Sequence, residues 1–379
     1  MSRSMTRWLE QQASVRERRG LVRHPLARRA DESVIDLASN DYLGLARDPR
    51  VTAAAAEAAR TWGAGSTGSR LVTGTTQLHD ELEHRLAEFT GASGALVFSS
   101  GYLANLGAVV TLGGPDVTIV SDANNHASLI DACRLSRSPV VVVPHRDVDK
   151  LDAALANVDT AHAVVVTDAV FSVDGDLAPI AAMHAAARRH RALMVVDEAH
   201  SLGVVGPRGE GAVAAAGLAD ASDIVRTVTL SKSLGSQGGA VLAAPDVLEL
   251  LVNTARAFIF DTALAPAALG AARAALDVLH DEPHRAASAR DNARRLAGVV
   301  RALGIETTEP AGAVVPAVLG DPRRAVAAAG SCLEQGVRVG CFRPPSVPPG
   351  RACLRLTARA DLTGTDLDRV AAVLANVLT

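Results

Sequence analysis

The segment Leu193-Met-Val-Val-Asp197-Glu-Ala-His200 is a short apolar run that ends in a carboxylate, with an imidazole three residues further on. A continuous run of apolar and β-branched residues is typical of a strand that is covered on both faces, as in a parallel sheet. In open parallel sheets, ligands bind beyond the carboxyl ends of the strands. The segment therefore predicts a buried strand and a ligand site that begins at Asp197.

The same kind of run recurs six more times, and the runs alternate with alanine-rich helical stretches. The other runs are residues 95–98, 117–120, 140–143, 163–166, 224–229 and 240–243. The alternation predicts an α/β fold with a seven-stranded, mostly parallel sheet. After about residue 265 a long helical stretch (267–303) leads into a smaller α+β portion and a terminal helix at 366–378. We expect an N-terminal helical arm (1–40), a large domain (41–265) and a small C-terminal domain (266–379).

The composition narrows the class of protein. The chain has 379 residues, of which 48% are hydrophobic and 21% charged, and its formal net charge is −3, so no basic excess points to nucleic acid. The polar, arginine-rich start has no apolar core of a signal peptide, and no apolar run is long enough to span a membrane. We therefore expect a cytoplasmic globular protein that binds neither membrane nor nucleic acid. The four cysteines lack C-x-x-C spacing and are expected to be reduced thiols, with no metal site.

Lysine is almost absent from the chain. Of 38 basic residues only Lys150 and Lys232 are lysines. Arginine replaces lysine as a surface cation, but it cannot supply a deprotonatable primary amine that forms a Schiff base or takes up a proton. Lys150 lies in a polar stretch among aspartates, where solvent exposure explains it. Lys232 follows the predicted strand 224–229 in Thr229-Leu-Ser-Lys232, which favours a chemical role.

Two motifs suggest nucleotide binding, and their context excludes it. Gly63-Ala-Gly-Ser-Thr-Gly68 matches a dinucleotide fingerprint, but an alanine-rich helix precedes it where that fingerprint needs a strand. Asp197-Glu-Ala-His200 matches a helicase motif, but neither lysine follows a glycine as a phosphate-binding loop requires.

Polar groups follow most of the predicted strands. They are Ser100-Gly101-Tyr102 at the start of a helix, His126, Ser172, Asp197, His200, Thr229 and Lys232. Each alone is explained by a turn, a helix cap or a satisfied loop residue. Together they place an amine, a carboxylate, two imidazoles, hydroxyls and an anion-binding helix start at one sheet edge. Pyridoxal phosphate needs that set of groups.

Asp197-x-x-His200, Thr229-Leu-Ser-Lys232 and Asn40-Asp-Tyr-Leu-Gly44 resemble motifs of the α-oxoamine synthases, which are fold-type I, pyridoxal-phosphate-dependent transferases. The resemblance runs from about residue 21 to the C-terminus, with the motifs in family order. It implies a homodimeric acyltransferase that condenses an amino acid with an acyl-CoA thioester and releases CO₂. Arg343-Pro-Pro-Ser-Val-Pro348 and Leu354-Arg-Leu-Thr357 are most similar to the member in biotin biosynthesis, which uses L-alanine and pimeloyl-CoA.

The resemblance also implies a role for each matching residue. Lys232 would carry the cofactor and move the α-proton, Asp197 would pair with the pyridine nitrogen, and His126 would stack on the ring and face the substrate. His200 and Ser172 would contact the phenolic oxygen of the ring. The phosphate would be bound by Gly101, Tyr102 and Thr229 and, across the dimer interface, by Thr262. Arg355 with Asn40 would bind the amino acid's carboxylate, and Arg23 and Ser346 would face the acyl substrate. Ser201 and Ser233 depart from the glycine or alanine usual in the family, and neither change removes a functional group.

Three alternatives stay open. A family member that joins glycine to acetyl-CoA would share most of these motifs. An aminotransferase on the same fold would share Asp197 and Lys232 but not the Asn40 or Arg343–Pro348 motifs. A non-catalytic binding protein would have no reason to keep Lys232 when nearly every other basic position is arginine.

Overall fold

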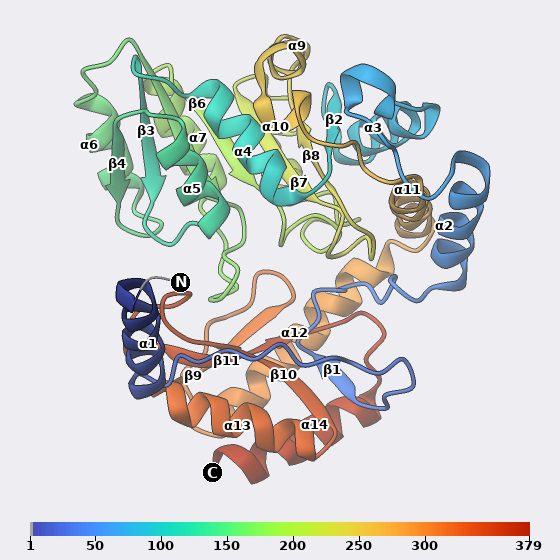
Figure 1. The fold of residues 1–379 in the computed structure, drawn as a ribbon, viewed down its shortest axis with the longest axis vertical. Coiled ribbons are helices and arrows are strands. Elements are labelled where there is room, and N and C mark those ends of the chain that lie inside the picture. Colours follow the sequence, from blue (N-terminus) through green and yellow to red (C-terminus); the bar gives the residue numbers. More distant parts are fainter. Residues whose placement is uncertain (1–2) are drawn as a thin grey trace.

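The computed structural model describes residues 3–379 and contains two sheets (Figure 1). The larger sheet has seven strands, in the spatial order β2-β8-β7-β6-β5-β3-β4. Their bounds are β2 Ala95–Phe98, β3 Val117–Asp122, β4 Val140–Val143, β5 His162–Asp168, β6 Leu193–Asp197, β7 Ile224–Thr229 and β8 Gly239–Leu242. Only β8 runs antiparallel to its neighbours, β2 and β7. The predicted seven-stranded, mostly parallel sheet is therefore confirmed.

Alternate residues of the central strands face opposite helical layers. Val164 and Val166 of β5 belong to the core shared with α4 and α5, whereas Val165 belongs to the core shared with α6 and α7. The helices of this unit are α2 Pro49–Trp62, α3 Gln77–Thr90, α4 Gly101–Leu112, α5 Ala127–Leu135, α6 Val148–Ala156, α7 Ile180–Arg189, α8 Ala212–Ala215, α9 Pro245–Thr254, α10 Arg256–Ile259 and α11 Pro266–Asp281. Burial on both faces explains why the strand sequences are continuously apolar.

Two local features refine the sequence prediction. In β4, Val140, Val141 and Val142 are exposed, because β4 is an edge strand of the sheet. The glycine-rich segment 63–68 follows α2 and precedes the π-helical turn η1 (Arg70–Gly74), so the helix predicted before it is confirmed.

The smaller sheet lies in the lower half of the molecule in Figure 1, with strand order β1-β10-β11-β9. Its strands are β1 Ile35–Leu37, β9 Val314–Gly320, β10 Val337–Phe342 and β11 Ala352–Thr357, and its helices are α12 His284–Ala302, α13 Pro322–Glu334 and α14 Gly364–Leu378. The predicted helical stretch 267–303 is two helices, since α11 ends before Pro283 and α12 begins after it. Helix α11 packs against α2 and α3 of the large unit. The expected division of the chain at residue 266 stays a prediction.

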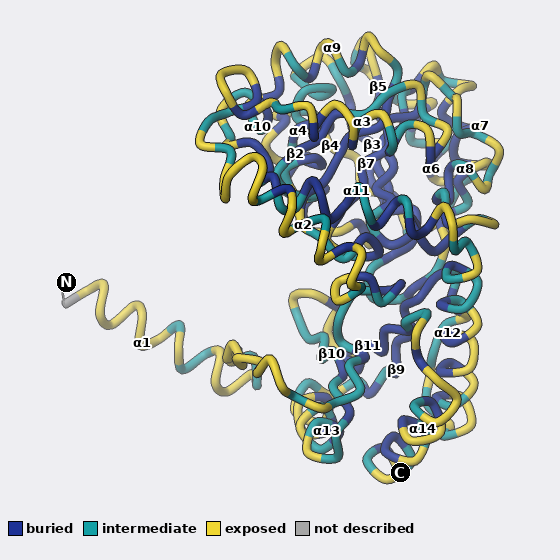
Figure 2. The backbone as a smooth tube through the Cα atoms, turned by 90° about the vertical axis from the view of Figure 1, so that its right-hand side faces the viewer, coloured by how far each residue is buried: buried dark blue, intermediate teal, exposed yellow. Residues whose placement is uncertain are grey.

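Helix α1 (Arg3–Arg18) projects away from the body of the molecule, and most of its residues are exposed (Figure 2). Within residues 3–379, no helix is both long and apolar enough to cross a membrane.

Candidate active site

The carboxyl ends of the large sheet's strands border two neighbouring cavities. The smaller, of about 290 Å³, is lined by residues of the large unit alone: Ser100, Gly101, Tyr102, Asn105, His126, Ser128, Asp168, Asp197, Ala199, His200, Thr229, Ser231 and Lys232. The larger, of about 750 Å³, lies between the two units and is lined by Asn40, Ser172, Arg355 and the loop 344–349, among others. His126, His200 and Lys232 line both cavities, so these three side chains stand where the cavities meet.

One end of the smaller cavity is built to hold an anion. Gly101 is the first residue of α4, and the Ser100 hydroxyl caps this helix by accepting the Leu103 N–H at 3.1 Å. The first N–H groups of a helix have no partner within it and attract negative charge. A Cβ at Gly101 would lie 2.9 Å from the Thr229 Cβ, so only glycine lets the helix start this close to the hydroxyl of Thr229. A phosphate group fits this end.

Lys232 joins a line of polar groups that crosses to the small unit. Its Nζ lies 3.0 Å from His200 Nε2, and His200 Nδ1 lies 2.5 Å from the Tyr42 hydroxyl. Tyr42 in turn donates to Asn40 Oδ1 at 3.2 Å. Desolvation at the cavity wall lowers the pKa of Lys232 to about 8, although the nearby carboxylate of Asp197 acts against it. A fraction of this amine is therefore neutral near pH 7, as a nucleophile or base requires.

Two carboxyl groups, Asp168 and Asp197, stand side by side at the ends of β5 and β6. Asp197 is buried; its Oδ1 accepts the Ala199 N–H at 2.8 Å and its Oδ2 accepts from Asn105 Nδ2 at 2.7 Å. Asp168 accepts the backbone N–H of His126 at 2.7 Å. Burial and the charge of Asp197 raise the pKa of Asp168 well above its ordinary value, which favours its neutral form. Asp197 is thus the carboxylate available to a protonated ring nitrogen.

Arg355 is a buried cation that faces the larger cavity. Its Nη1 donates to the Ser172 carbonyl at 2.9 Å, its Nη2 donates to Asn40 Oδ1 at 2.8 Å, and its guanidinium lies 4.4 Å from the centre of the Phe342 ring. Its Nε is buried without a partner, and no acidic side chain among residues 3–379 forms an ion pair with it. A buried, unpaired guanidinium is suited to bind a carboxylate.

The structure brings most of the predicted site residues together and leaves two outside. Ser346 lines the larger cavity, whereas Arg23 only approaches it, donating to the Pro344 carbonyl at 3.4 Å. Thr262 is exposed, forms a bridge with Ser69, and lines neither cavity. Its expected role toward a second subunit stays a prediction.

The polar residues that sequence reasoning missed at the site include Asp168, Tyr42, Asn105 and Ser128. Tyr42 lies within the quoted Asn40–Gly44 motif, but nothing in the sequence places it against His200. Asn105 is the polar residue of an otherwise apolar stretch from Leu103 to Val110, and this exception was the available signal. Ser128 lies two residues after His126, at the start of α5.

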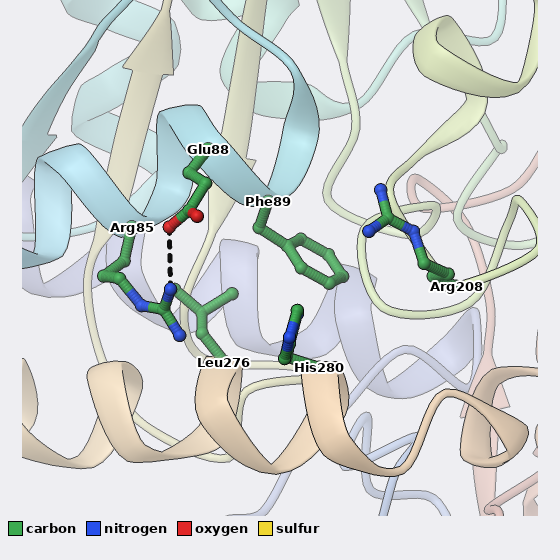
Figure 3. Close-up of a pocket in the computed structure, with 6 residues that line it drawn as sticks. All are labelled: Arg85, Glu88, Phe89, Arg208, Leu276 and His280. Carbon is green, nitrogen blue, oxygen red and sulfur yellow. Dashed lines mark hydrogen bonds and ion pairs between the residues drawn. The ribbon is translucent and has the colours of Figure 1, made fainter.

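A separate small pocket of about 60 Å³ lies between α3 and α11 (Figure 3). Arg85 at its wall is already paired with Glu88 at 2.7 Å and with Asp277. The pocket contains none of the predicted site residues, so it does not compete with the sheet-edge cavities. In the described part of the chain, no three His, Cys, Asp or Glu side chains are grouped so as to hold a metal ion.

Comparisons with known proteins agree with this geometry. The family model for aminotransferase class I and II matches residues 32–374. The 8-amino-7-oxononanoate synthase of Mycobacterium sp. (strain KMS) is 59% identical over 372 residues, covering 98% of this chain and 96% of the relative. A serine palmitoyltransferase from S. paucimobilis, solved with a bound PLP-myriocin aldimine, superposes with a TM-score of 0.91 at 33% identity, covering 99% of this chain and 97% of that one. The 8-amino-7-oxononanoate synthase of Francisella tularensis has a TM-score of 0.78 at 26% identity, covering 91% and 98%.

The match extends over nearly the whole chain and includes the elements that build both cavities. The groups at the smaller cavity fit pyridoxal phosphate: a helix start and hydroxyls at one end, Asp197 at the other, and the amine of Lys232 between the two cavities. The chain therefore belongs to the aminotransferase class I and II family of pyridoxal-phosphate enzymes, within the α-oxoamine synthase group that its motifs resemble.

Proposed function

We propose that the chain condenses L-alanine with a pimeloyl thioester of coenzyme A and releases 8-amino-7-oxononanoate, CO₂ and free coenzyme A. The observation that carries the proposal is the position of Lys232. Its amine borders a cofactor-sized cavity on one side and, on the other, a larger cavity that contains a buried, unpaired guanidinium. The relatives at 56–59% identity bear the name of this activity.

The smaller cavity holds the cofactor through groups of matched charge. The N–H groups at the start of α4, with the Thr229 hydroxyl, bind the phosphate. Asp197 would hold a proton on the ring nitrogen, His126 would pack on the ring, and Lys232 would supply the amine for the covalent attachment. When bound, pyridoxal phosphate supplies an electron sink that stabilises negative charge at the amino acid's α-carbon.

Lys232 performs the proton transfers. Its free amine would remove the α-proton of L-alanine, and burial, which lowers its pKa to about 8, favours the basic form that this transfer needs. The imidazole of His200, 3.0 Å from Nζ, orients the amine, and Tyr42 orients this imidazole in turn. Asp197 would contribute where charge develops, because its carboxylate favours a protonated ring nitrogen.

The larger cavity receives both substrates. Arg355 binds the carboxylate of L-alanine, held in place by Asn40, the Ser172 carbonyl and the Phe342 ring. Ile130, Phe171, Val173 and Val347 give the cavity apolar walls for a methylene chain. Ser346 lines this cavity and Arg23 donates to the Pro344 carbonyl beside it, which supports their proposed contact with the acyl substrate.

We further propose that two copies form the working enzyme, with Thr262 of each serving the phosphate site of the other. Thr262 is exposed and lies on the bridge to Ser69, outside both cavities of its own chain. A residue that serves a partner's site needs this exposure.

The test is an assay of the purified protein with pyridoxal phosphate and each of two amino acids, L-alanine and glycine, against pimeloyl-CoA and acetyl-CoA. Release of the coenzyme A thiol gives the rate, and mass spectrometry identifies the product. We expect the pair L-alanine and pimeloyl-CoA to have the highest kcat/KM. A preference for glycine and acetyl-CoA would assign the chain to the ketobutyrate-forming reaction, and amino-group transfer without thiol release would assign it to the aminotransferases.

A further inference from the structure

A buried hydrogen-bond bridge connects Asp197 to His126 through two residues that the reaction above does not use. Asn105, on α4, donates through Nδ2 to Asp197 Oδ2 at 2.7 Å and to Ser128 Oγ at 2.7 Å. Ser128, the second residue of α5, lies 2.7 Å from His126 Nδ1. Asn105 is 2% exposed and Ser128 is fully buried, so the two residues at the centre of the bridge have little contact with solvent.

The chemistry of the groups fixes the direction of every bond in this bridge. An ionised carboxylate only accepts, so the group of Asn105 that faces Asp197 is the NH₂. Its Oδ1 then accepts from the Thr227 hydroxyl, at 2.5 Å. The second N–H of the same NH₂ is donated to Ser128 Oγ, which leaves the Ser128 hydroxyl proton for His126.

The tautomer of His126 follows from these directions. Its Nδ1 receives the Ser128 hydroxyl and, more weakly at 3.3 Å, the Ser128 backbone N–H. A nitrogen that accepts from two donors carries no proton, so the ring is neutral and its proton is on Nε2. His126 lines both cavities, and Nε2–H is the polar hydrogen that the ring presents to them.

We propose that Asn105 and Ser128 are positioning residues that fix the carboxylate of Asp197 in one orientation and His126 in its Nε2–H tautomer. One amide would thereby set the carboxylate that pairs with the cofactor's ring nitrogen and, through one hydroxyl, the imidazole that packs on the ring. The roles of Asp197 and His126 toward the cofactor rest on the proposed function, whereas the tautomer is a property of the chain itself.

Nitrogen-15 NMR of the full-length protein, labelled at its histidines and free of cofactor and substrate, tests the tautomer. His126→Asn identifies the resonances of His126. In the wild type we expect an unprotonated Nδ1 and a protonated Nε2. Ser128→Ala leaves only the longer backbone N–H on Nδ1, so its shift should move toward that of a protonated nitrogen. Ser136→Ala, which removes a buried hydroxyl at the other end of α5 that donates to Cys133 O, should leave His126 unchanged.

Asn105→Asp keeps the shape of the side chain, removes its NH₂ and sets a second carboxyl group beside Asp197. We expect it to shift the His126 nitrogens as Ser128→Ala does. We also expect the dissociation constant for pyridoxal phosphate, measured by equilibrium titration, to rise about tenfold to a hundredfold, since a bond to a buried charge is lost.

His126 resonances unchanged in both Ser128→Ala and Asn105→Asp would overturn the proposal, as would a protonated Nδ1 in the wild type. These measurements need no turnover. They can therefore fail while the proposed reaction stands, and the reaction can fail while they succeed.

Discussion

At the residue scale, the negative charge of Asp197 is the first feature to test. Asp197→Asn keeps the size of the side chain and removes the charge that holds a proton on the ring nitrogen. We expect removal of the α-proton to slow by at least about a hundredfold, since the change acts where charge develops. The measurement is exchange of the α-hydrogen of L-alanine in D₂O without acyl substrate. Asp149→Asn, at an exposed position of α6, is the charge-matched control, and exchange at the wild-type rate in Asp197→Asn would reduce Asp197 to a side chain that stabilises the turn after β6.

Arg355 tests the carboxylate site at the same scale. Lysine keeps the positive charge, but it cannot donate to the Ser172 carbonyl, Asn40 and a substrate carboxylate from one planar group. Arg355→Lys should therefore weaken binding of L-alanine about tenfold to a hundredfold, corresponding to a loss of roughly 1.5–3 kcal/mol, with little change in the KM for pimeloyl-CoA. Initial rates over a matrix of both substrates measure the two constants. An unchanged KM for L-alanine would place the carboxylate elsewhere.

Residue types and their order along the chain were enough to predict that Lys232, Asp197 and His200 lie at the site, because each follows an apolar strand in a family motif. Tyr42 and Asn105 could not be predicted in the same way. Their contacts join segments 158 and 92 residues apart, to His200 and Asp197 respectively, and only the folded packing brings these segments together. Local pattern carries no information on such pairs.

At the element scale, His145 clamps the end of β3 to the turn that follows β5. Its Nδ1 lies 3.0 Å from Asp122 and its Nε2 lies 2.9 Å from Asp176, which also pairs with Arg146. Burial of the ring lowers the pKa, but the two carboxylates outweigh it and raise the pKa of His145 to about 9. A raised histidine pKa means that the clamp stabilises the fold fully below pH 6.5 and loses this effect as the pH rises through 9.

His145→Gln should therefore lower the midpoint of thermal unfolding most at pH 6 and least at pH 9.5. The difference at pH 6 corresponds to at most about 3 kcal/mol. Comparing the variant with the wild type at each pH cancels the titration of other groups, Lys232 included. A difference that stays constant from pH 6 to pH 9.5 would show that His145 acts by packing on the Phe171 ring and not by charge.

The strands were predictable because both faces of the large sheet are covered, which makes each strand continuously apolar. The exposure of β4 could not be predicted, because its sequence is as apolar as that of a central strand. Its position at the edge depends on the order of the strands in the sheet. The break between α11 and α12 was visible in principle at Pro283, but the helical pattern on either side concealed it.

At the scale of the whole molecule, the site is shared between units: Lys232 follows β7 of the large sheet, and Arg355 lies in β11 of the small one. The proposed role of Thr262 extends this sharing to a second copy. Thr262→Glu would place a negative charge against the partner's phosphate, and Lys232→Ala removes the amine, so each variant alone should be inactive. In a mixed dimer, one site combines the unchanged Lys232 of one copy with the unchanged Thr262 of the other. Co-refolding the two variants should therefore recover activity. No recovery, with mixed dimers demonstrated by mass spectrometry, would show that Thr262 serves its own chain.

The central claim is that Lys232 carries the cofactor, and the near absence of lysine makes it directly testable. Borohydride reduction of the protein loaded with pyridoxal phosphate fixes the cofactor to its amine, and trypsin then leaves residues 227–256 as one uncut peptide if Lys232 is modified. We expect the cofactor-derived mass on this peptide at Lys232, and none in Lys232→Ala. The same mass on Lys150, the exposed lysine of α6, with Lys232 unmodified, would contradict the account.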